Sequence, residues 1–329
     1  MSKPAGIHKG EGCLFRWSLG LQDTVNLSDF ESDKFTDMIW LAKLSILSFQ
    51  HHFPEADFVL LYNGPDFASF EKMFWRVMPE LDALLLIVNQ RDSDDVRFRN
   101  PYHFHPRGVW WKWVPFRFDI SKHEIAVDTD IVCLSRPETW YEWLNGNEEI
   151  LIAPERYETV LVNTCGDFWQ HPVLTGKKPF NCGVVGQRAN IDFADRFFEI
   201  TQEVDLGASH NSMFITEQGA INLWVRSLEV EGVKHCVLDF KKNAWVRDFL
   251  YFVERGIDIE TVHAVTWHKK IVRGLKQVFE RKVVNDSYTQ QEFVSDLLKQ
   301  SSSFEDLEHY IIRRQITPGN TLEREILLG

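Results

Sequence analysis

The first ninety residues alternate between short apolar runs and longer amphipathic stretches. Apolar runs at 13–19, 57–62 and 84–88 have the length and composition of buried strands. Apolar side chains recur at three- and four-residue spacing over 35–49, and 67–77 has the same character, so both stretches are predicted to be helices. Strands that alternate with helices predict an α/β fold with a sheet covered by helices. The third strand, LLLIV, is expected to be buried on both faces.

Two aspartates interrupt a fourth apolar run, which spans residues 125–134 and is predicted to be the fourth strand. Asp128 and Asp130 follow directly after the apolar triplet IAV. Residues two apart on an extended chain point to the same face, so the two carboxylates are expected side by side. Such a pair needs a positive partner, and its hard oxygen atoms suit a divalent cation whose other ligands are waters and substrate phosphates.

The position of this aspartate pair supports the metal interpretation. In open α/β sheets, ligands bind beyond the carboxyl ends of the strands, which is where the pair is expected. The alternative is a strand end with two solvated acids. A second Asp-x-Asp, at 92–94, lies in a run of charged residues and is interpreted as such a solvated loop.

An aromatic segment, residues 101–118, lies between the third and fourth predicted strands. Three tryptophans surround Lys112 in this segment. Their rings are able to stack on a nucleobase or a sugar. The alternative is a helix that packs its aromatic face on the sheet, and this is expected for at least two of the three rings.

Residues 179–186, PFNCGVVG, form a further apolar run that two residues interrupt. Gly183 allows the close approach of a ligand to the backbone. Asn181 offers both a hydrogen-bond donor and an acceptor. The alternative is a turn that leads into a strand.

Two later segments carry polar side chains of interest. The stretch 216–225 is predicted to be a helix with Thr216 as its N-cap, and Glu217 and Gln218 would then lie in its first turn. Acidic side chains are common there for structural reasons alone. The segment 262–270 is rich in groups that bind metals or phosphates, and two lysines there are able to neutralise a diphosphate. These groups are His263, His268, Lys269 and Lys270.

The chain changes character after residue 275. Residues 1–275 are predicted to form the α/β domain. Residues 276–329 are predicted to form a helical appendage, with helices over 290–300 and 304–314.

Composition narrows the functional classes. The chain has 329 residues and a formal net charge of −12, which disfavours nonspecific binding to nucleic acid or to an anionic membrane. Five scattered cysteines, with no Cys-x-x-Cys spacing, are expected to be reduced, buried thiols. No apolar run has the length of a membrane span and the start does not resemble a signal peptide, so a cytoplasmic protein is expected.

Four segments, in this order, resemble motifs of the GT-A glycosyltransferases, particularly the glycogenin-like retaining family 8. AVDTD resembles the Asp-x-Asp motif after a hydrophobic strand, and FNCG over 180–183 resembles Phe-Asn-x-Gly. EQGAIN over 217–222 resembles Asp-Gln-Asp-x-Leu-Asn, and HAVTWHK over 263–269 resembles His-x-x-Gly-x-x-Lys. Glu217 stands in place of the first Asp, and Thr266 in place of the central Gly. The resemblance covers roughly residues 13–270 and implies a GT-A-like, mainly parallel sheet flanked by helices.

The resemblance implies that the protein transfers a sugar from a nucleotide-sugar, a UDP-sugar, to a glycan, protein or small-molecule acceptor. Asp128, Asp130 and His263 would hold Mn²⁺ or Mg²⁺ against the two phosphates of the donor. Lys269 would bind the diphosphate, and Lys112 matches a basic residue that contacts the donor. The chemistry agrees, because a divalent cation and a lysine stabilise a leaving diphosphate without proton transfer.

The remaining matched residues would surround the transferring sugar. Asn181 and Gln218 would lie near it, Glu217 would contact its hydroxyls, and Gly183 would let the donor approach the backbone. Amide side chains can supply the polar face that a developing oxocarbenium-like centre needs. The spacing fixes no obvious carboxylate nucleophile, so a front-face route with retention of configuration is expected.

Two alternatives remain open. The first is a nucleotidyltransferase on a related fold, which normally has a Gly-rich phosphate loop near its N-terminus. This chain has only Gly6, Gly10 and Gly12 there, before the first strand. The second is a protein that binds a nucleotide or a sugar without catalysis, with the aromatic segment 101–118 as its binding surface.

Overall fold

The fold is taken from a computed structural model. It describes residues 12–20, 33–81, 85–90, 112–113, 115–155, 165–202, 213–245, 252 and 255–263, and a few positions between 278 and 296. The predicted boundary at 275 and the two helices predicted beyond it lie almost entirely outside these residues, as does the charged run at 92–94.

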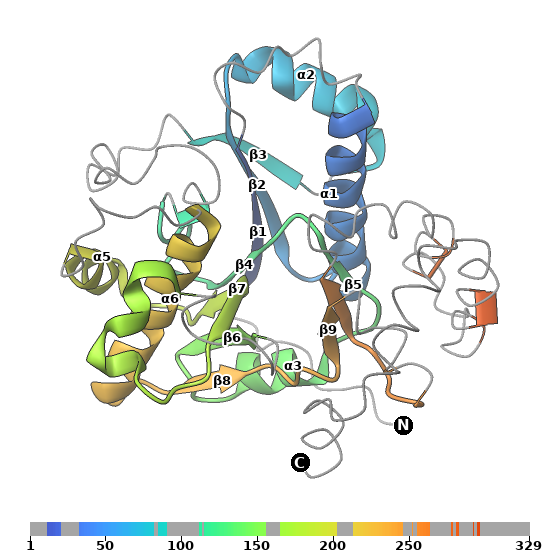
Figure 1. Ribbon diagram of the computed structural model, residues 1–329. Coiled ribbons are helices and arrows are strands. Elements are labelled where there is room, and N and C mark those ends of the chain that lie inside the picture. The colour runs from blue at the N-terminus through green and yellow to red at the C-terminus, as the bar shows by residue number, and fades with distance from the viewer. Residues whose placement is uncertain are drawn as a thin grey trace.

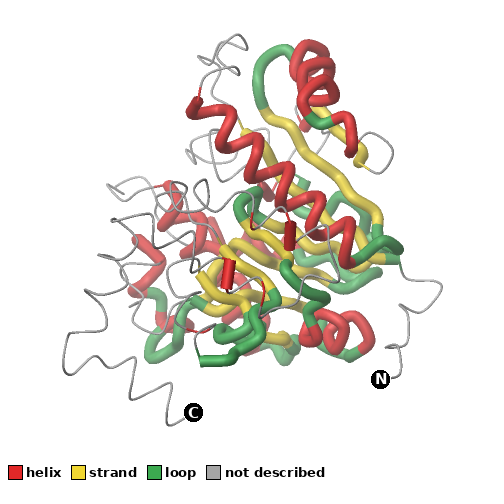
Figure 2. Tube along the Cα trace, turned by 90° about the vertical axis from the view of Figure 1, so that its right-hand side faces the viewer, coloured by secondary structure: helices red, strands yellow, loops and turns green. Residues whose placement is uncertain are grey.

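The main sheet has seven strands within the described residues, in the order β3-β2-β1-β4-β7-β6-β8 (Figures 1 and 2). Strand β7 is antiparallel to β4 and β6, and the other neighbours are parallel. The mixed, mainly parallel α/β sheet expected from the sequence is therefore confirmed. The strands are β1 (Cys13–Gly20), β2 (Asp57–Asn63), β3 (Leu85–Asn89), β4 (His123–Val127), β6 (Ile150–Pro154), β7 (Phe180–Gln187) and β8 (His235–Val237).

Helices cover both faces of this sheet. Alternate residues of β1 point to opposite faces, and Phe15 and Trp17 pack with α1 (Asp33–His52), α2 (Phe67–Val77) and α3 (Glu138–Asn145). The other face packs on α5 (Ala194–Gln202), α6 (Met213–Val230) and the short 3₁₀ helices η6 (Gly166–Gln170) and η7 (Pro172–Leu174). Another 3₁₀ turn, η2 (Pro79–Leu81), follows α2. Figure 1 shows α1 on one side of the strands and α5 and α6 on the other.

A small second sheet lies at one end of α1. It comprises β5 (Ile131–Cys133), β10 (Thr261–His263) and β9 (Asn243–Trp245), in that order. Two buried hydroxyls of α1 hold β5 in place. Ser48 Oγ accepts a hydrogen bond from the backbone N–H of Cys133 (2.9 Å), and Ser45 Oγ donates to the carbonyl of Ile131.

Three predictions about individual elements are wrong. The expected strand 125–134 breaks after Val127. The N–H of Asp128 still donates to the carbonyl of Gly183 on β7, but the carbonyl of Asp128 accepts from the N–H of Ile131, which closes a tight turn. The residues that follow enter the second sheet. The third strand is not buried on both faces, since β3 is an edge strand and Leu86 is 54% exposed. The helix predicted from Thr216 begins at Met213, so Thr216 is not its N-cap.

The structure also describes the state of the cysteines and the character of the helices. The cysteines are all free thiols, as expected; four are buried and Cys236 is partly exposed. Among the described helices, none combines the length and the apolar character that crossing a bilayer requires.

A buried ion pair ties β1 to β4. Arg16 Nη1 lies 3.1 Å from Glu124 Oε1, and both side chains are buried. Arg16 also donates to the carbonyls of Pro115 and Phe116, while Glu124 Oε2 accepts from the backbone of Phe118. The pair therefore fixes the chain that directly follows Lys112.

Replacing Glu124 by Gln keeps the shape of the side chain but leaves Arg16 buried without a counter-charge. We expect the free energy of unfolding, measured with urea, to fall by about 3 kcal/mol. The control is Asp57→Asn, which breaks the ion pair between Lys122 and an aspartate that is 59% exposed. We expect that change to cost less than about 1 kcal/mol. Equal losses in the two variants would contradict the importance of the buried pair.

Candidate functional site

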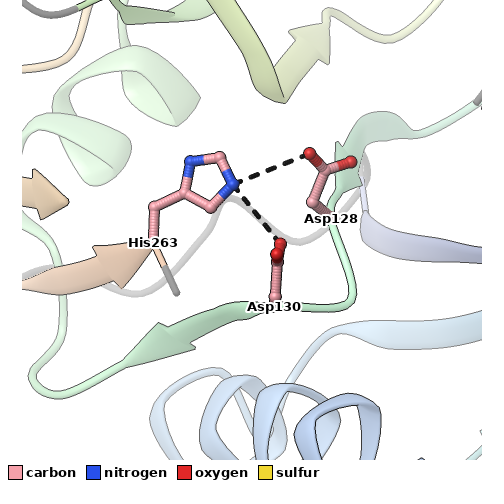
Figure 3. A group of neighbouring side chains, drawn as sticks. All are labelled: Asp128, Asp130 and His263. Atoms are coloured by element: carbon pink, nitrogen blue, oxygen red, sulfur yellow. Dashed lines mark ion pairs between the residues drawn. The ribbon is translucent and has the colours of Figure 1, made fainter. Parts of the chain in front are cut away.

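Asp128, Asp130 and His263 form a cluster with the character of a metal site (Figure 3). His263 Nε2 lies 3.3 Å from Asp130 Oδ1 and 3.9 Å from Asp128 Oδ2. One potential ligand atom from each residue lies within 4.8 Å of the others. The two aspartates occupy the turn between β4 and β5, and β10 places His263 opposite Ile131. The sequence prediction that these three residues come together is confirmed.

The electrostatics of this cluster favour a positive charge. Burial disfavours the charged imidazolium, but the carboxylates of Asp130 and Asp128 outweigh this effect, so the pKa of His263 lies above its ordinary value. A bound cation would replace the proton that makes His263 an imidazolium. Two carboxylates and an imidazole form a mixed oxygen and nitrogen ligand set, which suits Mn²⁺ better than the all-oxygen environment that Mg²⁺ prefers.

Lys112 joins this cluster to the start of β7. Its Nζ donates to Asp128 Oδ1 (2.6 Å) and to the carbonyl of Cys182. Glu217 Oε1 lies 3.8 Å from the same Nζ. Burial favours the neutral amine, but the negative charge of Asp128, with that of Glu217, outweighs it, so the pKa of Lys112 is raised. The lysine is therefore a fixed positive charge beside the aspartate turn.

Glu217 is a buried carboxylate in the second turn of α6. It is 2% exposed. Its Oε1 accepts from Trp113 Nε1 (2.6 Å), and its Oε2 accepts from the thiol of Cys182 (3.0 Å). Burial raises its pKa, Lys112 opposes the shift, and Asp128 adds to it. The sequence offered a purely structural reason for Glu217, the preference for acids in the first turn of a helix. That reason does not apply, because α6 begins at Met213 and its first turn contains no acid.

Trp113 belongs to the core. Its ring is fully buried, as expected for tryptophans that pack on the sheet. The other two tryptophans of the aromatic segment lie outside the described residues, and so does Lys269.

Asn181 and Gln218 form an amide pair held by a residue that the sequence did not single out. Both side chains donate to Glu155 Oε2, Asn181 at 3.2 Å and Gln218 at 2.6 Å. Asn181 Oδ1 also accepts from the backbone N–H of Gly183 (2.7 Å). Glu155 follows β6, which runs parallel to β4, so both strands end at the same edge of the sheet. The signal for Glu155 in the sequence is a carboxylate that directly follows the apolar run of residues 150–154.

A bulge in β7 places the backbone of Gly183 between these groups. Ile152 pairs with Val185 but Ala153 pairs with Asn181, so residues 182–184 have no partner on β6. A Cβ at Gly183 would lie 2.9 Å from His263 Cε1 and 2.8 Å from Asn181 Oδ1. The glycine is therefore required for the close approach of the histidine.

A pocket of about 340 Å³ opens beside Glu155, at the edge where β6 ends and β7 begins. Its walls combine apolar rings with two basic and two acidic side chains. They are Pro154, Glu155, Lys178, Pro179, Phe180, Arg226, Val237, Leu238, Asp239 and Phe240.

Comparison with known proteins gives a result for the structure but not for the sequence. No family model and no curated protein matches the chain. Among solved structures, the bifunctional glycosyltransferase WbbM superposes with a TM-score of 0.53 over 90% of this chain, at 12% identity. The chain spans about half of WbbM, 52% of its length.

The chain has the GT-A fold. Mouse xyloside xylosyltransferase 1 covers 78% of this chain and 98% of its own (TM-score 0.46, 13% identity), and the galactosyltransferase LgtC covers 84% and 98% (TM-score 0.48, 12% identity). At these identities the likeness concerns the fold alone. The superposition on WbbM confirms the expected GT-A architecture.

Adding a methyl group at Gly183 tests the metal cluster. We expect Gly183→Ala to displace His263 and to weaken Mn²⁺ binding about tenfold, as measured by calorimetry. The matched control on the same strand is Gly186→Ala, whose Cβ would meet Leu151 and Trp143 in the core. That variant should lose about 1–3 kcal/mol of stability and keep its Mn²⁺ affinity. Equal Mn²⁺ affinities for wild type and Gly183→Ala would remove His263 from the ligand set.

Proposed function

We propose that the protein is a metal-dependent glycosyltransferase that uses a nucleotide-sugar, a UDP-sugar, as donor. The observation that carries the proposal is the Asp128–Asp130–His263 cluster at the carboxyl edge of a GT-A sheet. The GT-A fold adds support, since the neighbours WbbM and LgtC are named as a glycosyltransferase and a galactosyltransferase. The acceptor is a glycan, a protein or a small molecule.

Departure of the diphosphate is the step that this cluster serves. Asp128, Asp130 and His263 would hold Mn²⁺ or Mg²⁺, which supplies Lewis-acid stabilisation of the leaving phosphates. Lys112 holds a second positive charge next to Asp128, already desolvated and oriented before the donor binds. Lys269 would add a charge from the segment after β10. No proton transfer to the leaving group is needed, because its negative charge is stabilised in place.

The amide pair would face the transferring sugar. Gln218 and Asn181 are uncharged and polar, and they are able to stabilise an electron-poor anomeric carbon without forming a stable ester. We propose a front-face reaction with retention of configuration on this basis. Gly183 would act indirectly, by leaving room for His263 beside the backbone.

Glu217 would serve the reaction indirectly. The motif resemblance places it on the sugar hydroxyls, but its carboxylate is buried against Trp113 and Cys182. We propose that it holds Lys112 in position, since the lysine lies between it and Asp128. Any contact between Glu217 and a sugar would require these side chains to separate.

Removing one ligand tests the diphosphate site. UDP is titrated calorimetrically into metal-free protein, with and without Mn²⁺. We expect tight binding only with Mn²⁺, and at least about tenfold weaker binding in Asp130→Asn. The control is Asp192→Asn, since Asp192 accepts from the backbone at the start of α5. Equal UDP affinity with and without Mn²⁺ would contradict the roles of the three ligands.

Turnover separates this function from the second candidate, a protein that binds without catalysis. The replacements at Glu217 and Thr266 relative to the resembled motifs keep that candidate open. Release of UDP from a panel of UDP-sugars, lost in Asp130→Asn or with EDTA, would establish a transferase. Metal-dependent UDP binding with no release from any donor would favour binding alone.

A further inference from the structure

Glu155 makes contacts that suit an organising residue. It lies directly after β6 and is 9% exposed. One of its carboxylate oxygens accepts from both Gln218 Nε2 (2.6 Å) and Asn181 Nδ2 (3.2 Å). The two amides come from α6 and β7, so a single acceptor fixes side chains from separate elements.

The chemistry of a carboxylate determines how the two amides are turned. An ionised carboxylate only accepts hydrogen bonds, so each amide must direct its NH₂ group toward Glu155. The N–H of Gly183 only donates, which independently places Asn181 Oδ1 on the opposite side. The orientation of both amides therefore follows from their partners.

The carbonyl oxygen of Gln218 then points toward the side chain of Cys182. Its Oε1 lies 4.0 Å from Cys182 Sγ. The backbone carbonyl of Cys182 accepts from Lys112, which also donates to Asp128. The oxygen, and not the NH₂ group, therefore lies on the side of Cys182, the residue whose backbone contacts Lys112. An oxygen there stabilises positive charge, whereas an NH₂ group would oppose it.

We propose that Glu155 is a positioning residue that fixes Gln218 with its carbonyl oxygen toward the transferring sugar. This role rests on the proposed function, in which the amide pair faces the transferring sugar. Glu155 itself need not touch the donor.

The first experiment requires no donor. Side-chain amide signals of Gln218 and Asn181 are recorded by ¹H–¹⁵N NMR and assigned with Gln218→Glu and Asn181→Asp. In Glu155→Ala we expect the Gln218 NH₂ signals to shift and to exchange faster with water. In Glu155→Gln the change should be smaller, because one carbonyl oxygen can still accept. Unchanged Gln218 signals in Glu155→Ala would overturn the proposal.

The second experiment measures hydrolysis of the UDP-sugars in the panel, which involves no acceptor. We expect Glu155→Ala to lower kcat about 100-fold with little change in KM, and Glu155→Gln to recover part of the loss. The affinity for UDP with Mn²⁺ should stay within about twofold of wild type, which also shows that the site is folded. The matched control is Glu149→Ala at the other end of β6, where the carboxylate accepts from the backbone of Lys234.

The outcomes separate this proposal from the proposed function. Hydrolysis unchanged in Glu155→Ala would show that Glu155 serves only the neighbouring pocket, and would overturn the positioning role. Loss of UDP affinity in step with kcat would also overturn it, since the effect would then be structural. Absence of metal-dependent UDP binding in the wild type would overturn the proposed function, while the NMR result would still decide the orientation of Gln218.

Discussion

The close packing of carboxylates around one lysine governs the architecture of this site. Asp128 and Glu217 both approach Lys112 Nζ, and Asp130 lies close to Asp128 in the cluster with His263. A buried lysine is costly unless it is paired, and so is a buried glutamate. Each group is therefore stable only because the others are present. Lys112 leaves the negative charge of the two aspartates only partly balanced. The raised pKa of His263 shows that this cluster favours a further positive charge.

The fold supplies these groups from segments far apart in the chain. The turn after β4, the residue after β6 and the start of β7 meet at one edge because β7 runs antiparallel between the other two. Helix α6 and strand β10 complete the cluster from the two sides. The Arg16–Glu124 pair holds residues 115–119 across β1 and β4, which fixes the direction in which Lys112 reaches the edge.

The sequence predicted the parts whose signals are local. Apolar periodicity gave the alternating strands and helices, and the motif order gave the Asp128–Asp130–His263 cluster. Prediction from the sequence failed where a partner far away in the chain determines the local structure. Strand β4 ends where the carbonyl of Asp128 accepts from the N–H of Ile131, and the chain then pairs with β10, a strand far away in the sequence. Glu155 has its amide partners 26 and 63 residues away, so the apolar run before it marks its place at a strand end but not its partners. Thr216 is a good N-cap residue, but α6 continues past it toward Met213.

The short run from Asn181 to Gly183 connects the two halves of the site. Asn181 donates to Glu155, while the carbonyl of Cys182 accepts from Lys112 and the carbonyl of Gly183 accepts from the N–H of Asp128. Consecutive residues of a strand are spaced by about 3.3 Å, and that spacing is covalently fixed. The distance between the cation-binding side and the amide pair is therefore set before any donor binds. A glycosyl–phosphate bond placed across it would meet charge stabilisation on both sides without reorganisation of the protein, which is the main requirement for electrostatic catalysis.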